Sequence, residues 1–221
     1  MIRQSPLARF STEIVGLLEP RAQHMVVEAW LEDSCRSTAT DQVTVQVAAV
    51  TGRPHSTQGD LAQLITTTRK LKMETHGLPM TCIEHSSVLD GRGHVDFLRL
   101  LLLVTEKLHD STRALVRQGR TVIVYGGALH NDLYPRWPLE ELSYAQSLAA
   151  ELGGGVLELD LVVPEIVAPM AMVRREDWFP LLGRASPDRV IVWARGPGSY
   201  VIILPARDES VAKVAKPIAL M

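Results

Sequence analysis

The sequence predicts an α/β fold: a mostly parallel sheet with helices on both faces and a C-terminal antiparallel hairpin. Short β-branched or apolar runs alternate with longer stretches of helical periodicity, as they do in βαβ units. Near the C-terminus, two strand-like runs follow each other with only a glycine- and proline-rich turn between them. At 221 residues the chain fits a single domain, with a core over about residues 6–165 and a hairpin extension over about residues 166–205.

The first elements are expected between residues 6 and 54. Apolar residues recur at helical spacing over 6–18, and this helix stops before Pro20. Residues 24–30 form a strand. The segment 32–54 is ambiguous, because the alternation of valines with polar residues at 43–47 fits a strand but also fits the start of a helix.

The middle of the chain predicts two helices around a strand. A helix is expected over 60–74, with Gly77 as its C-cap. Residues 79–85 form the next strand, and a long helix over 95–118 is closed by Gly119.

Three further elements lead into the tail. Residues 121–125 form a short β-branched strand, and a helix runs from Pro138 to Leu152, where three glycines end it. Residues 156–163 form another strand. The hairpin then pairs 189–193 with 200–204 through a turn at 195–199.

Composition excludes several classes of partner. A formal net charge of −2 gives no electrostatic footprint for nucleic acid, and two cysteines do not make a disulfide framework. The first ten residues lack the continuous apolar segment of a signal peptide. The most apolar run, 97–104, is too short to span a bilayer and contains Arg99. We therefore expect a cytoplasmic protein without a membrane span.

A histidine follows the strand at 121–125 at a position typical of a ligand site. The strand ends in two glycines, of which Gly127 lets the backbone approach a ligand closely, and His130 comes three residues later. Ligands of open α/β sheets lie outside the carboxyl ends of the strands. His130 is therefore expected at that edge, with Asn131 or Asp132 as the partner that orients its imidazole.

Other predicted strands also carry carboxylates or imidazoles near their ends. These carboxylates and imidazoles belong to Glu28, to Glu84 and His85, and to Glu158 and Asp160. Because parallel strands present their carboxyl ends at one edge, these groups are candidates for a divalent metal site or for acid/base chemistry. Adjacent strand residues point to opposite faces, so Glu84 and His85 share a pocket only if the strand has already ended. Asp160 also fits a solvent-facing position of an edge strand.

Several familiar motifs are absent. The sequence has no Gly-x-Ser-x-Gly elbow, no phosphate-binding Gly-x-x-x-x-Gly-Lys loop, no Rossmann Gly-x-Gly-x-x-Gly after a strand and no His-Glu-x-x-His. These absences argue against a serine hydrolase, an NTPase and a nicotinamide enzyme. His24, His55 and His76 lie in no recognisable motif.

Two short motifs resemble the haem-binding-uptake/Tiki superfamily, which includes Tiki and TraB proteins, ChaN-like lipoproteins and erythromycin-esterase-like proteins. One is the strand ending in Gly127-Ala-Leu-His130, and the other is the earlier strand ending in Val26-Val-Glu28. The similarity covers the elements from about residue 6 to about 165. The family's first Gly-x-x-His normally follows a strand that would precede the first helix here, which implies a truncated N-terminus or a degenerate member.

The resemblance implies that the protein binds a small-molecule or metal ligand, and it implies one of two functions. In a metal-dependent hydrolase, Glu28 and His130 would hold a divalent metal or act as base and acid, with Glu84 or His85 completing the metal's ligands. The alternative is a haem- or iron-binding module.

In a haem-binding module, His130 or a tyrosine such as Tyr125 or Tyr134 would be the axial ligand. A third alternative is a domain that keeps the fold without any catalysis. We also expect that loss of His130 weakens ligand binding about 10-fold or more while the fold survives, since loop residues contribute little to a core.

Overall fold

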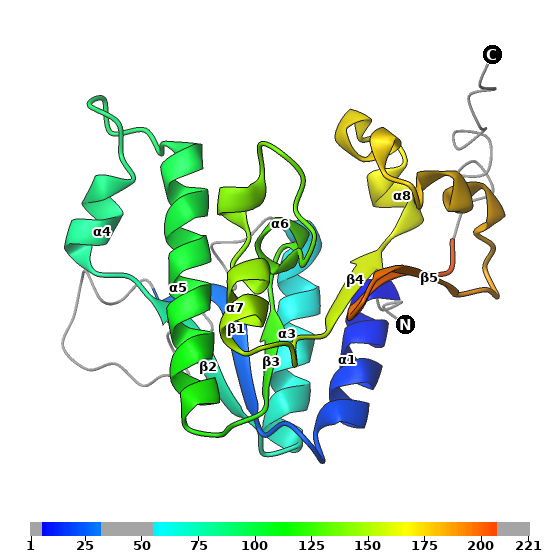
Figure 1. Ribbon diagram of the computed structural model, residues 1–221, viewed down its shortest axis with the longest axis horizontal. Helices are drawn as coiled ribbons and strands as arrows, with labels where there is room; N and C mark the ends of the chain where they lie inside the picture. The colour runs from blue at the N-terminus through cyan, green and yellow to red at the C-terminus, as the bar shows by residue number, and fades with distance from the viewer. Residues whose placement is uncertain (1–5, 32–54, 207–221) are drawn as a thin grey trace. The chain divides into compact units, whose positions relative to one another are not determined.

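A computed structural model describes residues 6–31 and 55–206 (Figure 1). The predicted α/β class is confirmed. The chain divides into two compact units, each with its own three-stranded sheet. The larger unit covers Ala8–Val156, and the smaller unit contains the described chain from Leu157 on.

The larger unit is built on a parallel sheet with the strand order β2-β1-β3. Its strands are β1 (His24–Leu31), β2 (Glu74–Pro79) and β3 (Val122–Tyr125). Its helices are α1 (Pro6–Leu18), α3 (His55–Lys70), α4 (Cys82–Ser87), α5 (Phe97–Arg117), α6 (Ala128–Asn131) and α7 (Ala145–Glu151), with a 3₁₀ turn η2 (Glu140–Leu142).

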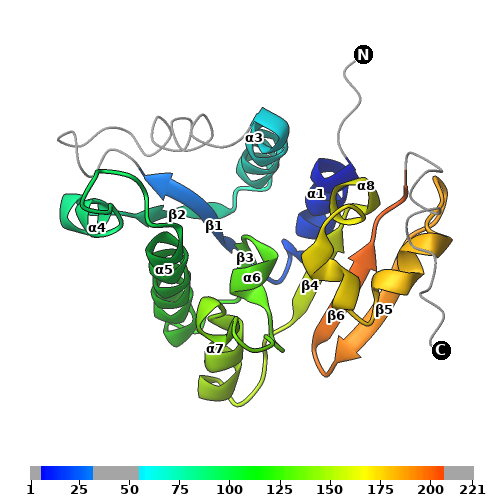
Figure 2. The same cartoon turned by 90° about the horizontal axis from the view of Figure 1, so that it is seen from above.

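Helices cover both faces of this sheet, as predicted. Successive residues of a strand point to opposite faces. Met25 and Val27 of β1 accordingly pack with residues of α1 and α3, whereas Val26 packs with residues of α5 and α7. Figure 2 shows α1 and α3 on one side of the strands and α5 and α7 on the other. The central strand is thus buried on both sides.

The prediction of a strand at 79–85 was wrong. The strand β2 ends at Pro79, and α4 begins after Thr81. Thr81 caps this helix with its side chain, which accepts from the Glu84 backbone N–H, and the Glu84 carboxylate accepts from the Thr81 N–H in return. This capping box provides acceptors for the backbone N–H groups of Thr81 and Glu84. It thereby favours a helix over a strand in the run that follows.

The helix expected over 60–74 ends earlier, at Lys70. Lys72 has a φ of 58°, so the backbone turns into the left-handed region before β2 begins. Gly77, expected as the C-cap, lies inside β2. The long helix predicted at 95–118 is confirmed as α5, and Gly119 after it has a φ of 75°.

The helix expected from Pro138 to Leu152 is broken into η2 and α7. Ser143 lies between them with extended backbone, and its hydroxyl donates toward the carbonyls of His130 and Asp132. A serine that bonds backbone outside its own helix competes with helical pairing, which explains the break.

The smaller unit has the strand order β4-β6-β5. Its elements are β4 (Glu158–Val162), α8 (Pro164–Val167), η3 (Ala171–Arg175), η4 (Phe179–Arg184), β5 (Ile191–Gly196) and β6 (Ser199–Ile203). The antiparallel hairpin is confirmed: Ile191 pairs with Ile203, and Pro197-Gly198 forms the turn. The expectation that the strand at 156–163 joins the main sheet was wrong, because β4 pairs in parallel with β6.

Among the described residues, no helix combines the length and the apolar composition that crossing a bilayer requires. The ambiguous segment 32–54 lies outside the described residues.

Candidate functional site

The sheet topology brings Glu28 to the turn that follows β3. Val27 of β1 is in register with Tyr125, the last residue of β3, so Glu28 lies beside the first of the two glycines. The helix α3 follows β1 on one face of the sheet, and α7 follows β3 on the other. In open α/β sheets, ligands bind where neighbouring strands lead to opposite faces in this way.

Glu28 explains why two glycines end β3. Its carboxylate atom Oε2 accepts a hydrogen bond from the Gly127 backbone N–H. A Cβ on Gly126 would lie 3.0 Å from this oxygen, and a Cβ on Gly127 would lie 3.3 Å from it. A side chain at either position would crowd the carboxylate, so glycine favours its close approach.

His130 lies in α6 with its imidazole held in one orientation. The atom Nδ1 is 3.1 Å from the Leu142 carbonyl oxygen and 2.8 Å from the Thr105 hydroxyl. A carbonyl can only accept, so we assign the proton to Nδ1. In the neutral imidazole, Nε2 then carries the lone pair.

The edge of the ring at Cδ2 lies beside Gly127. The ring carbon Cδ2, which is bonded to Nε2, lies 3.8 Å from the position that a Cβ on Gly127 would occupy, and Glu28 Oε2 lies 3.3 Å from the same position. The carboxylate and this edge of the imidazole therefore both lie beside Gly127.

Two expectations about His130 need correction. Thr105 and Leu142 orient its ring, in place of the predicted Asn131 or Asp132. His130 is also not a loop residue with little part in the core: its exposure is 2% and its backbone N–H and C=O are both hydrogen-bonded. A buried, bonded side chain contributes to stability, so its loss affects the fold as well as a ligand.

Asn131 and Tyr144 extend the same network. The Tyr144 hydroxyl donates to Asn131 Oδ1 at 2.8 Å, and the Asn131 amide donates to the Gly127 carbonyl at 3.2 Å. Burial raises the pKa of Tyr144, and the negative charge of Glu28 raises it further. The carboxyl-edge cluster is therefore Glu28, Gly127, His130, Asn131 and Tyr144.

Tyr144 was missed in the sequence because it falls inside the helix predicted from Pro138. Asp132 and Tyr125 lie nearby with other contacts. Asp132 Oδ1 accepts from the Tyr134 N–H at 2.7 Å and so shapes the loop after α6. Tyr125 packs with the apolar residues between the sheet and α3.

Glu84 occupies the first turn of α4 rather than a strand end. Its carboxylate is paired with Lys107 of α5 and bonded to Thr81. The hydrogen bond from Lys107 is the largest cause that lowers the pKa of Glu84 to about 2. The side chain of His85 lies outside what the structure describes. Glu28, Glu84 and His130 do not form a group of three with ligand atoms within 4.8 Å of one another.

Glu158 and Asp160 lie on β4 of the smaller unit. The Glu158 carboxylate accepts two hydrogen bonds from Arg195, at 2.8 and 2.9 Å, and its side chain is 5% exposed. This is a structural ion pair within the second sheet, and Glu158 does not share the sheet of Glu28.

A group of three potential metal ligands includes two histidines that lie in no recognisable sequence motif. Within the described part of the chain, His24, Glu74 and His76 have ligand atoms within 4.8 Å of one another. They lie at the amino ends of β1 and β2. In the sequence, the alternation Glu74-Thr-His76 indicates that Glu74 and His76 lie on one face of a strand. The proximity of His24 depends on the pairing of β1 with β2, which no sequence pattern indicates.

A comparison of the chain with protein-family models, with curated proteins and with solved structures found no match. The resemblance to the haem-binding-uptake/Tiki superfamily thus stays a prediction.

Proposed function

We propose that the carboxyl-edge cluster is a hydrolytic site for a small-molecule ligand, in which Glu28 and His130 act as the acid/base pair. One observation carries the proposal: the Glu28 carboxylate and the imidazole of His130 both lie beside Gly127, at the point where the sheet topology favours ligands. Glycine at 126 and 127 leaves the backbone without side chains at that point.

The chemistry assigns each residue a part. His130 Nε2 accepts a proton from water or from a substrate hydroxyl. The Leu142 carbonyl and the Thr105 hydroxyl, both close to Nδ1, hold the ring in this orientation. Glu28 supplies the negative charge that orients the attacking water, and the Gly127 N–H fixes the carboxylate.

A divalent metal fits this pair. A carboxylate oxygen and an imidazole nitrogen are donors that zinc and manganese accept, and Glu28 and His130 would hold such an ion. A bound ion would supply an activated water.

The test is hydrolysis of chromogenic p-nitrophenyl acetate, phosphate and phosphodiester by the purified chain, with and without added Zn²⁺ or Mn²⁺. Glu28→Gln keeps the acceptor for the Gly127 N–H but removes the charge, and His130→Gln removes the base. Glu106→Gln, on the exposed side of α5, is the matched control. We expect kcat/KM to fall about 100-fold or more in the two site variants, as for loss of general acid/base catalysis, and to stay unchanged in the control.

Metal titration of the same proteins separates the two modes of action. If Glu28 and His130 hold an ion, each variant weakens its binding about 10-fold or more. If hydrolysis needs no added metal and persists with a chelator, Glu28 and His130 act by acid/base catalysis alone. Equal hydrolysis by the wild type and both variants would reject the proposal, and a Soret band on adding haem would favour the haem-binding alternative.

A further inference from the structure

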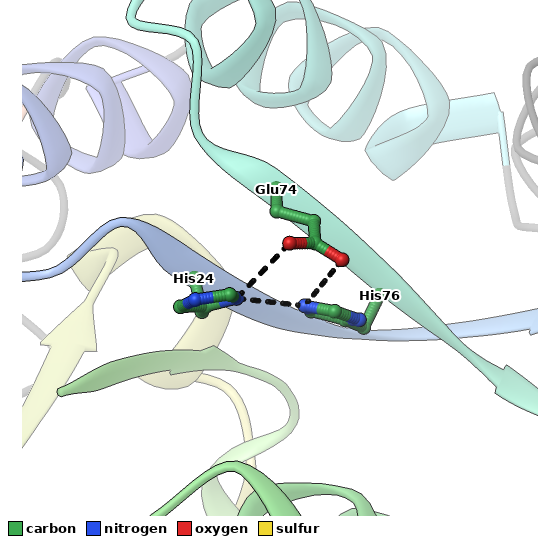
Figure 3. A group of neighbouring side chains, drawn as sticks. All are labelled: His24, Glu74 and His76. Atoms are coloured by element: carbon green, nitrogen blue, oxygen red, sulfur yellow. Dashed lines mark hydrogen bonds and ion pairs between the residues drawn. The ribbon is translucent and has the colours of Figure 1, made fainter. Parts of the chain in front are cut away.

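We propose that His24, Glu74 and His76 form a second site, which binds a divalent transition-metal ion of the zinc class (Figure 3). We call these three residues the amino-edge cluster. The proposal is independent of the hydrolytic function above, because none of its ligands belongs to the carboxyl-edge cluster.

The pairing of β1 with β2 puts the three side chains on one face. His24 and Glu74 are Cα partners in the parallel register, and His76 is the partner of Val26. Residues two apart on a strand share a face. His24 therefore shares a face with Val26, and Glu74 and His76 share that face with Leu78. At its amino end, this otherwise apolar face carries two imidazoles and a carboxylate.

The backbone beneath the cluster is fixed by hydrogen bonds. The Glu74 N–H donates to the Gln23 carbonyl at 2.8 Å, which ties the start of β2 to the residue before His24. On the other face of β2, the Thr75 hydroxyl lies 3.1 Å from the hydroxyl of Thr68 on α3. Ligands carried on strands that are held in this way are prearranged for an ion.

The spacing of the donor atoms matches a metal's coordination sphere. His24 Nδ1 lies 3.2 Å from His76 Nε2 and 3.5 Å from Glu74 Oε2, and His76 Nε2 lies 3.8 Å from Glu74 Oε1. Four ligands at the 2.0–2.1 Å that zinc prefers are about 3.3 Å apart in a regular tetrahedron. The donors therefore need only small side-chain adjustments to share one ion.

The protonation states also suit a metal. Two imidazole nitrogens at 3.2 Å share one hydrogen between them, and an ion can take its place once the donor ring carries this hydrogen on its other nitrogen.

The donor set selects the class of ion. Two imidazoles and one carboxylate suit Zn²⁺, Co²⁺, Ni²⁺ or Fe²⁺, whereas Mg²⁺ and Ca²⁺ prefer oxygen ligands. The Glu74 side chain is 67% exposed, so solvent reaches the cluster. Three protein ligands with solvent access leave a position for water.

The two clusters lie at different positions along β1, at its first residue, His24, and at its fifth, Glu28. His24 and Glu28 are four residues apart on this strand, which corresponds to about 13 Å. An ion at the amino edge therefore does not touch the carboxyl-edge cluster, and the two sites can be tested separately.

The experiment is isothermal titration of the tag-free, metal-free full chain with Zn²⁺, followed by Co²⁺ with its visible absorption as a report on coordination. We expect one ion per chain at this site and a rise in Tm with metal. His76→Gln and Glu74→Gln should each lower the affinity at least 10-fold. Glu74 is exposed, so its replacement leaves the fold intact and keeps the test decisive even if a histidine variant folds poorly.

Two control variants locate the ion. His94→Gln removes an exposed histidine that also has a carboxylate beside it, at 3.5 Å from Asp90, and should leave the affinity unchanged. Glu28→Gln reports on the carboxyl-edge cluster and should leave this ion in place. The proposal is overturned if Zn²⁺ does not bind below about 100 µM, if Glu74→Gln and His76→Gln bind it as the wild type does, or if Glu28→Gln alone abolishes binding.

Discussion

Glu84 illustrates at the scale of one residue how a predicted site carboxylate came to serve the fold. Its carboxylate accepts a hydrogen bond from the Thr81 N–H at the start of α4, and it forms an ion pair with Lys107 on α5. A glutamine at this position can still complete a capping box, so Glu84→Gln removes the ion pair and keeps the cap.

We predict that Glu84→Gln destabilises the chain by about 1 kcal/mol or less at pH 7, since the pair is partly exposed to solvent. The pKa of Glu84 is about 2, below its ordinary value near 4.5. A lowered pKa gives stability that is present above the ordinary value and lost as the pH falls toward 2. The difference in unfolding free energy between wild type and variant, from urea titrations, should therefore shrink between pH 4.5 and 2. A difference that stays constant over this range would contradict the assignment.

The residues of the carboxyl-edge cluster differ in how far the sequence predicts them. Gly127, His130 and Asn131 come directly after β3 and follow from one rule, that parallel strands gather their carboxyl ends at one edge. Glu28 was expected at the end of its strand, but β1 continues to Leu31. Tyr144 and the ring partners Thr105 and Leu142 come from other elements, so only tertiary packing identifies them.

At the scale of the element, strands and helices were predicted where periodicity and capping agreed. The helix α5 has an apolar stripe, an Asp96 cap and a closing glycine, and its predicted limits differ from the observed ones by two residues or fewer. The run after Pro79 contains apolar residues that suit a strand, but the capping box at Thr81 decides for a helix. Local hydrogen bonding outweighed β propensity there.

The three strands of the smaller sheet are joined by one ion pair. Glu158 on β4 is paired with Arg195 on β5, and Arg195 Nε also donates to the Ser199 hydroxyl on β6 at 3.1 Å. The carboxylate is 5% exposed and the guanidinium side chain 14%. Removing one partner of such a pair leaves a poorly solvated charge.

We predict that Glu158→Gln destabilises the smaller unit by about 3 kcal/mol, the cost of breaking a largely buried pair. The double variant Glu158→Gln with Arg195→Met should recover part of this loss, because no uncompensated charge remains. Chemical denaturation of both variants and of Arg195→Met alone completes the cycle. Additive losses in the double variant would show that the two residues do not depend on each other.

At the scale of the whole molecule, the sequence predicted the class but not the grouping of the strands. The alternation of strands and helices indicates a parallel sheet, and the hairpin was predicted from its turn. Nothing in the run 156–163 shows which sheet it joins. That choice depends on pairing with β6, between residues about 40 positions apart, and on the apolar cluster of Val162, Val201 and Ile203. Contacts of this range have no local pattern.

Each unit has an apolar core of its own, and this leads to the last prediction. The two clusters that flank the parallel sheet consist entirely of residues between Val15 and Val156. A fragment of residues 6–156 keeps all of them, together with the whole of α1 and both proposed sites. We expect this fragment to unfold in one cooperative transition, measured by circular dichroism, because its core and sheet are complete.

Zinc titration extends this prediction to the amino-edge cluster. The fragment should bind Zn²⁺ with the affinity of the full chain, since His24, Glu74 and His76 and the backbone beneath them all lie within it. Leu64→Ala, which opens a cavity at a fully buried position between α3 and the sheet, is the control. This substitution should cost about 2–5 kcal/mol of unfolding free energy and lower the Tm. The loss of free energy should be similar in the fragment and in the full chain. If the fragment shows no cooperative transition, the parallel sheet does not fold independently of the residues after Val156.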